Sequence, residues 1–288
     1  MRARDDKNYE LDRASLRTSF ARAASTYDEA AVLQREVANR LLERLDLIRL
    51  KPGTILDAGC GTGYCARALK RRYPRAQVMG LDIATPMLAW ARRQRNWFRR
   101  TGFVGGDIER LPMSGASLDM VFSNLALQWC DLDVAFAEFA RVLRPGGVLM
   151  FTTFGPDTLK ELRTAWQAVD SAPHVHTFID MHDVGDALMR ARLGEPVMDV
   201  ERLTITYTDV LALMRDLKAI GSHNAATGRV RGLTGKTRFA RFRQAYESHR
   251  MDGRIPASYE VVFGHAWAPA PAGDPGSVRV PLETIRRP

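Results

Sequence analysis

An acid followed by three glycines is the stretch of this chain best suited to bind a charged small molecule. Asp57, Gly59, Gly61 and Gly63 are separated by single residues and follow the apolar pair Ile55 and Leu56. Glycine has no Cβ, so such a loop can approach a ligand closely. A phosphate site instead offers backbone N–H groups at a helix N-terminus. The carboxylate of Asp57 would repel a phosphate, and it suits a cationic group such as the ammonium of an amino acid.

The flanking residues predict that this loop joins a strand to a helix. Lys51, Pro52 and Gly53 are typical of a turn before a strand, and residues 64–69 begin a helical pattern. Strand, glycine loop and helix form the context of a nucleotide-binding loop. Further strands, alternating with helices, are expected at 77–83, 103–108, 117–124 and 148–154. This alternation predicts an α/β fold with a mostly parallel sheet.

The acid-and-glycine motif resembles the first motif of the class I S-adenosylmethionine-dependent methyltransferases. The resemblance implies a Rossmann-like sheet of seven mostly parallel strands, with S-adenosyl-L-methionine as the cofactor. This cofactor has an ammonium and a sulfonium and no phosphate, in agreement with the ligand that Asp57 favours. The four glycine-loop residues are therefore predicted to bind the cofactor.

A second acid, Asp82, stands 82 − 57 = 25 positions after Asp57, at the end of the next expected strand. Second strands of βαβ units present a carboxylate to a ribose at about this spacing. Asp82 is therefore predicted to bind the cofactor ribose, and the adjacent Ile83 is predicted to contact the cofactor. The alternative for Asp82 is a cap on the helix that starts near Thr85 and Pro86.

Two later strands also end in polar residues. Asp107, with the backbone of Ile108, is the candidate for binding the adenine amino group, and a solvated turn is the alternative. Asn124 follows the fourth strand, where an open α/β sheet binds its ligands. We therefore predict that Asn124 also contacts the cofactor.

Residues before the glycine loop predict a helical lid. Positions 11–48 suggest two helices with a break and an N-cap at 25–28, and such helices cover the cofactor in the superfamily. Tyr27 and Phe20 are candidates to face the site, and plain packing is the alternative. The second helix has an amphipathic stripe at Leu33, Val37, Leu41 and Leu45.

The chain is expected to have four parts. They are a helical lid (1–50), a cofactor-binding Rossmann-like core (51–155), a substrate side (156–268) and a mobile tail (269–288). The substrate side should contain the last two strands, near 196–207 and 259–267, with a helical insertion between them. Helices are also expected at 87–97, 135–142, 157–169 and 183–192.

Composition is that of an ordinary soluble globular protein, with 45% apolar and 26% charged residues. There is no apolar run of 18 residues and no secretory signal in the first 20, and three cysteines without metal-ligand spacing suit a reducing compartment. We therefore expect a cytoplasmic enzyme that binds no membrane. The net charge of +9 fits either a solvated face or an acidic partner.

Two histidines, His174 and His176, have no third ligand at a suitable spacing, so no metal site is expected. An Asn-Pro-Pro-Tyr sequence is absent after the fourth strand, which argues against methylation of DNA bases. No RNA-binding module is recognisable. The expected substrate is therefore a small molecule, a quinol or an acid on a carrier, and no nucleic acid is expected as a partner.

Up to about residue 267 the chain resembles the malonyl-acyl-carrier-protein O-methyltransferase family of biotin synthesis. The similarity lies in the runs 19–28, 33–34, 124–129, 178–186, 216–221, 232–235 and 259–262. It implies methyl transfer to the free carboxylate of a malonyl thioester, carried by acyl carrier protein or coenzyme A. A monomer is expected, and the sequence by itself leaves the oligomeric state open. Carrier proteins of this kind are acidic, which would account for the excess of basic over acidic residues in this chain.

A carboxylate is already a nucleophile near neutral pH, so this chemistry needs alignment rather than a strong base. A cation should hold the carboxylate, and the candidate catalytic residues are Tyr27, His174, His176, Arg229 and Arg231. Two alternatives remain open: methylation of a quinol or another small acid, and a methyltransferase fold that serves as an assembly or modifying factor for a partner protein.

Overall fold

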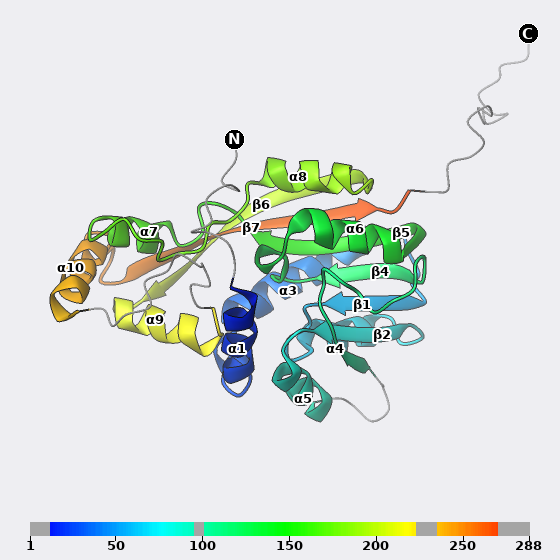
Figure 1. Ribbon diagram of the computed structural model, residues 1–288, viewed down its shortest axis with the longest axis horizontal. Helices are drawn as coiled ribbons and strands as arrows, with labels where there is room; N and C mark the ends of the chain where they lie inside the picture. Colours follow the sequence, from blue (N-terminus) through cyan, green and yellow to red (C-terminus); the bar gives the residue numbers. More distant parts are fainter. Residues whose placement is uncertain (1–11, 95–100, 223–234, 270–288) are drawn as a thin grey trace, which may run out of the picture.

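The computed structural model describes residues 12–94, 101–222 and 235–269, which form one seven-stranded sheet with helices on both faces (Figure 1). The strand order is β3-β2-β1-β4-β5-β7-β6. The strands are β1 (Thr54–Ala58), β2 (Gln77–Asp82), β3 (Gly102–Gly105), β4 (Leu118–Ser123), β5 (Leu143–Phe154), β6 (Gly194–Tyr207) and β7 (Ile255–Trp267). All neighbouring pairs are parallel except those of β7, which is antiparallel to β5 and β6. The predicted α/β class and mostly parallel sheet are confirmed.

Helices cover the sheet in two layers. Ahead of β1 come α1 (Arg13–Ala23), α2 (Tyr27–Ala30), α3 (Val32–Arg44) and the 3₁₀ turn η2 (Leu45–Leu47). The others are α4 (Tyr64–Arg72), α5 (Thr85–Arg93), η3 (Leu127–Trp129), α6 (Leu132–Val142), α7 (Lys160–Gln167), α8 (Met181–Arg190), α9 (Val210–Ala219) and α10 (Lys236–Glu247). Buried side chains of α3 and α4 form one hydrophobic cluster with the sheet, and those of α6 and α8 form another. The predicted insertion between the last two strands is α9 and α10.

Several predicted boundaries are wrong, because tertiary contacts set them. β7 begins at Ile255 rather than 259, since Ile255 pairs with Tyr207 at the end of β6. β5 begins at Leu143 rather than 148, since Leu143 pairs with Leu118. α7 begins at Lys160 rather than 157, because the preceding loop is bonded to β7 instead. α5 ends at Arg93, and the rest of the predicted helix 87–97 lies mostly outside the described residues.

The predicted break at 25–28 separates α1 from α2, and Thr26 occupies the predicted N-cap position. Thr26 precedes α2, but its side chain makes no capping hydrogen bond. Its hydroxyl instead donates to the carbonyl oxygens of Ala23, at 3.2 Å, and Ala219, at 2.9 Å. The break between α1 and α2 is thereby tied to the end of α9.

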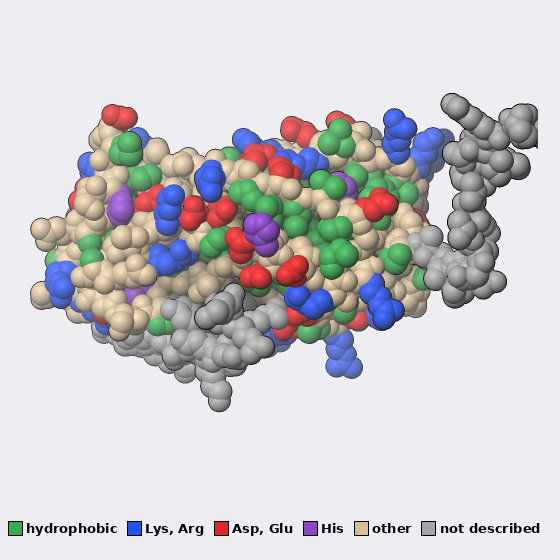
Figure 2. All heavy atoms as spheres, turned by 90° about the horizontal axis from the view of Figure 1, so that it is seen from above, with side chains coloured by type: hydrophobic (Ala, Val, Ile, Leu, Met, Phe, Trp, Pro, Cys, Tyr) green, Lys and Arg blue, Asp and Glu red, His purple; other side chains and the backbone are tan. Residues whose placement is uncertain are grey.

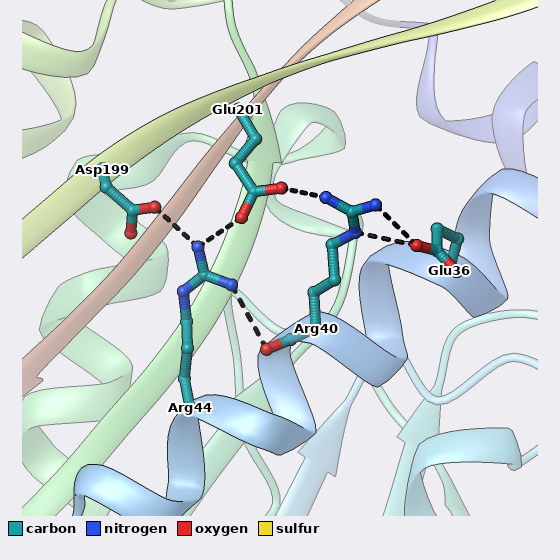
Figure 3. A network of polar contacts seen from close by, with 5 residues as sticks. All are labelled: Glu36, Arg40, Arg44, Asp199 and Glu201. Carbon is teal, nitrogen blue, oxygen red and sulfur yellow. Dashed lines mark hydrogen bonds and ion pairs between the residues drawn. The ribbon is translucent and has the colours of Figure 1, made fainter.

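Helix α3 packs one side into the hydrophobic core. Its predicted apolar stripe, Leu33, Val37, Leu41 and, just beyond it, Leu45, is buried. The polar side of the helix is joined to β6 by a network of ion pairs (Figure 3). Arg44 lies 2.6 Å from carboxylate oxygens of both Asp199 and Glu201, and Arg40 pairs with Glu201 as well.

The face covered by α8 carries acidic and basic side chains side by side, with apolar side chains among them (Figure 2). No helix among the described residues is long and apolar enough to cross a membrane.

Candidate cofactor site and its surroundings

A cavity with two adjoining lobes lies at the carboxyl ends of β1, β2 and β4. Four residues line both lobes and so mark their junction: Tyr27, Gly59, Gly61 and Asn124. The glycine loop after β1 therefore separates two binding regions. This is the edge where parallel α/β sheets bind their ligands.

The first lobe is largely apolar, with acids at its rim. Leu81, Met87 and Ile108 form walls, while Asp82 and Asp107 supply carboxylates. Ile83 also lines this lobe. Every residue that the sequence predicted to bind the ribose and the adenine therefore lies around one hollow.

Backbone N–H groups from two loops hold the carboxylate of Asp82. Its Oδ2 accepts a 2.8 Å hydrogen bond from the N–H of Gly61, and its Oδ1 accepts one of 2.8 Å from the N–H of Ala84. Burial raises the pKa of Asp82 from its ordinary value, and these N–H groups lower it in part. Each oxygen keeps a lone pair for a further donor.

Asp57 lines the second lobe with an unsatisfied buried oxygen. The residue is 1% exposed, and its Oδ2 has no hydrogen-bond partner. Burial raises the pKa of Asp57 to about 7, and the nearby Asp82 adds to the shift, whereas an N–H of Ala66 opposes it. A buried carboxylate oxygen without a partner is costly. A cationic ligand in the second lobe would remove that cost.

Two arginines line the same lobe, and the sequence analysis did not identify them. Arg67 donates a 2.7 Å hydrogen bond from Nη1 to the carbonyl of Thr62, and Arg35 donates to the carbonyl of Asp28. Burial lowers the pKa of Arg67 from its usual value. With Asp57, the lobe offers both charges that a zwitterionic amino acid requires. The available signal was the position of Arg67, one helical turn after Gly63.

The three glycines have different roles. Gly59 faces Ala126, and a Cβ at Gly59 would lie 2.4 Å from the Cβ of that residue. Gly61 lines both lobes, and a Cβ there would meet only the ring of Tyr27, at 4.0 Å. Gly63 lines neither lobe: its φ is +80°, and a Cβ there would lie 2.9 Å from the ring of Phe103. Gly63 therefore allows the loop to pack closely against Phe103, and it does not face the cavity.

Helix α1 covers the first lobe. Leu16 and Phe20 line it, and the Phe20 ring meets Trp129 edge-on at 5.8 Å between centroids. Arg13 pairs with Glu109 and lies 3.6 Å from Asp107. Helix α1 is thus held to the rim of the first lobe by ion pairs and by an aromatic contact. Tyr27 lies at the junction, where burial and the nearby Asp82 raise its pKa above the ordinary value.

The two histidines proposed from the sequence lie apart from each other. His174 stacks on Trp166 at 3.8 Å, its Nε2 lies 2.9 Å from Asp170, and it lines neither lobe. His176 stacks on Trp129, which lines the first lobe, and its Nε2 lies 3.2 Å from the carbonyl of Gln128. A carbonyl only accepts, so Nε2 carries the proton and Nδ1, which has no partner, is an acceptor.

Burial lowers the pKa of His176 to about 4, so its ring is neutral near pH 7. A neutral imidazole is not the cation that a carboxylate clamp requires. Arg229 and Arg231, the other predicted clamps, lie outside the described residues. Among the residues that the structure describes, no cluster of side chains is suited to hold a metal ion.

Comparison with known proteins gives consistent matches. A family model described as a methyltransferase domain matches residues 56–151. The malonyl-[acyl-carrier protein] O-methyltransferase of Laribacter hongkongensis is 58% identical over 268 residues, which cover 90% of each chain. The protein of the same description from Methylovorus sp. is 56% identical over 268 residues, which cover 91% of this chain and 90% of that relative.

Solved structures are similar in fold at low identity. The YcgJ protein of Bacillus subtilis has a TM-score of 0.57 at 18% identity, over 80% of this chain and 98% of that one. A SAM-dependent methyltransferase of Thermotoga maritima has a TM-score of 0.52 at 16% identity, over 88% of this chain and 99% of that one.

Proposed function

The chain belongs to the malonyl-[acyl-carrier protein] O-methyltransferase family, and from this premise we propose that it transfers a methyl group from S-adenosylmethionine to the free carboxylate of a malonyl thioester. The product is a malonyl methyl ester, which primes biotin synthesis. The enzyme is thus an S-adenosylmethionine-dependent O-methyltransferase. The observation that carries the proposal is the cavity itself. Its second lobe combines the carboxylate of Asp57 with two arginines, as a zwitterionic amino acid requires, and the four residues at the junction include no evident general base.

The side chains of the cavity fit this cofactor. The unpartnered Oδ2 of Asp57 suits the ammonium, and Arg67 and Arg35 suit the carboxylate of the same amino acid moiety. Asp82 has lone pairs for ribose hydroxyls, and the apolar first lobe, with Asp107 at its rim, suits the adenine. When bound, the cofactor supplies a methyl group activated by its sulfonium.

The residues at the junction act by position rather than by proton transfer. Gly59 and Gly61 offer backbone only, and the pKa of Tyr27 is raised above its ordinary value. The Asn124 amide donates to the carbonyl of Gln34 at 3.1 Å and accepts from the Thr152 hydroxyl at 3.0 Å. A malonyl carboxylate is ionised near pH 7 and needs no base. A site that aligns two reactants can lower the barrier by up to about 7–11 kcal/mol.

The proposed carrier of the malonyl group is acyl carrier protein, and coenzyme A is the other possibility. We also propose that the enzyme is a monomer.

Mass spectrometry of malonyl-loaded carrier protein, incubated with the enzyme and S-adenosylmethionine, tests the function. We expect the malonyl arm to gain one methyl group, and acetyl-loaded carrier protein, which lacks the free carboxylate, to gain none. Absence of methyl transfer, with cofactor binding demonstrated by calorimetry, would contradict the proposed substrate. It would then favour the quinol or assembly-factor alternatives.

A further inference from the structure

Helix α9 presents a mixed apolar and basic face to solvent. Leu211, Met214, Arg215 and Lys218 are spaced so that their side chains share one side of the helix. All four are exposed, Leu211 by 42% and Met214 by 37%. The opposite side packs into the core through Leu213, which is fully buried. Exposed apolar side chains next to basic ones on one face are typical of an interaction surface.

The basic groups of this face are available to a partner. Among the described residues, neither Arg215 nor Lys218 forms an ion pair, and the same holds for Arg243 of α10. The N–H of Ala212 lowers the pKa of Asp209, and Arg215 and Arg243 lower it further, so both guanidinium groups lie near one carboxylate. Asp209 at the N-cap and Asp216, which is hydrogen-bonded to Tyr207, balance the two bases of α9, so the positive excess at this end of the molecule comes from α10.

Helix α10, which Figure 1 shows at the same end of the molecule as α9, adds positive charge there. Its sequence has one acid, Glu247, against four bases: Lys236, Arg238, Arg241 and Arg243. Only Arg238 among these four pairs with a carboxylate in the described structure, that of Asp170. A surface of this kind raises the rate at which an anionic partner docks.

The basic face also lies beside the cofactor lid. The carbonyl of Ala219, the last residue of α9, accepts the 2.9 Å hydrogen bond from Thr26. Gly221 packs so closely on α1 that a Cβ there would lie 3.0 Å from the ring of Phe20, which lines the first lobe. A protein docked on α9 would therefore stand next to the wall of the cavity.

The face covered by α8 is a poorer candidate for an anionic partner. Within α8, Asp183 and Asp186 outnumber the single base Arg190, and Arg190 is paired with Asp133. Figure 2 shows acidic and basic side chains intermingled on this face. It has no region of one sign that would attract an acidic domain.

We propose that the exposed face of α9 is the docking surface for an acidic carrier domain that delivers the malonyl thioester. Carboxylates of that domain pair with Arg215 and Lys218, while its apolar side chains cover Leu211 and Met214. The arm that bears the malonyl group then reaches the cavity past the junction of α9 with the lid. This inference rests on the proposed function, because it takes the carrier-borne malonyl group as the substrate.

The test compares two substrates that share the reacting group and differ in the carrier. Malonyl-loaded acyl carrier protein has the acidic domain, and malonyl-pantetheine has the arm alone. For the full-length double variant R215E/K218E we expect the KM for the carrier-borne substrate to rise about tenfold or more at low salt. The KM for malonyl-pantetheine and the Kd for S-adenosylmethionine should stay within about twofold of the unchanged enzyme. The neutral variant M214Q should raise the KM for the carrier-borne substrate and leave that for malonyl-pantetheine unchanged. This increase should not depend on the salt concentration, because no charge is altered.

The matched control is R49E/K51E, which changes the net charge equally. Arg49 and Lys51 are exposed and precede β1, at the edge of the sheet opposite the cavity. If R215E/K218E leaves the carrier KM unchanged, or raises it no more than R49E/K51E does, α9 is not the docking surface. If the unchanged enzyme methylates neither substrate, the proposed function fails instead, so the two failures are distinguishable.

Discussion

The Oδ2 atom of Asp82 accepts a 2.8 Å hydrogen bond from the backbone N–H of Gly61, so the acid at the end of β2 is tied to the glycine loop after β1. The two strands pair in parallel, which brings their carboxyl ends together. One carboxylate can thus hold the loop and still face the first lobe.

Replacing Asp82 by alanine should weaken binding of S-adenosylmethionine about tenfold or more, because hydrogen bonds to a charged group contribute about 1.5–3 kcal/mol each. Isothermal titration calorimetry measures the change, with circular dichroism to check the fold. Asp46→Ala, which removes an exposed acid paired with Arg72, is the control and should bind normally. Unchanged affinity in Asp82→Ala would remove Asp82 from the ribose site.

Asp57 should make cofactor binding depend on pH. Its pKa is raised from 3.8 to about 7, so the folded protein without cofactor holds a proton that the unfolded chain releases. Its stability should therefore fall as pH rises from about 4 to about 7. A bound ammonium favours the ionised carboxylate, so affinity should rise with pH over the upper part of this window, by up to about tenfold per pH unit.

Calorimetry from about pH 5.5 to 7 tests this, since an α-amino group titrates only near 7.7–8.0. Asp57→Asn should bind weakly and without this pH dependence. An affinity of the unchanged protein that is flat over the same range would argue against ammonium binding at Asp57.

Gly63→Ala and Gly146→Ala separate backbone strain from steric overlap. Both glycines have positive φ, +80° and +75°, but a Cβ at Gly63 meets Phe103 whereas one at Gly146 has no atom within 4 Å. Each substitution should cost roughly 1–2 kcal/mol for the left-handed backbone. Gly63→Ala should lose a further 1–3 kcal/mol or so from overpacking. Equal losses in urea unfolding would contradict the packing role of Gly63.

His176 should stay neutral throughout the range in which an ordinary histidine titrates, because burial lowers its pKa to about 4. Nitrogen chemical shifts of its imidazole should therefore be constant from about pH 5.5 to 8. A histidine-containing peptide with an ordinary pKa of about 6.5, measured in the same buffer, provides the reference signal. Protonation of His176 near pH 6.5 would restore it as a candidate cation for the malonyl carboxylate.

Much of the fold was predictable because it is encoded locally. The spacing of Leu33, Val37 and Leu41 determines the buried side of α3, and the glycines after Asp57 fit one strand–loop–helix geometry. The predicted cofactor residues from Asp57 to Asn124 line the cavity, with Gly63 as the exception. They were identifiable because the carboxyl ends of parallel strands meet at one edge of the sheet.

Other features depend on contacts between segments far apart in the chain, and no local pattern reports them. The start of β7 is set by its pairing with β6, and the end of α9 is tied to Thr26 across most of the sequence. His174 and His176 are two positions apart, yet one packs on Trp166 and the other on Trp129. The sequence by itself thus determined the sheet, the loop and the type of ligand. Only the tertiary structure decided which charges surround the ligand, because the burial and the partners of each side chain exist only once distant segments have packed together.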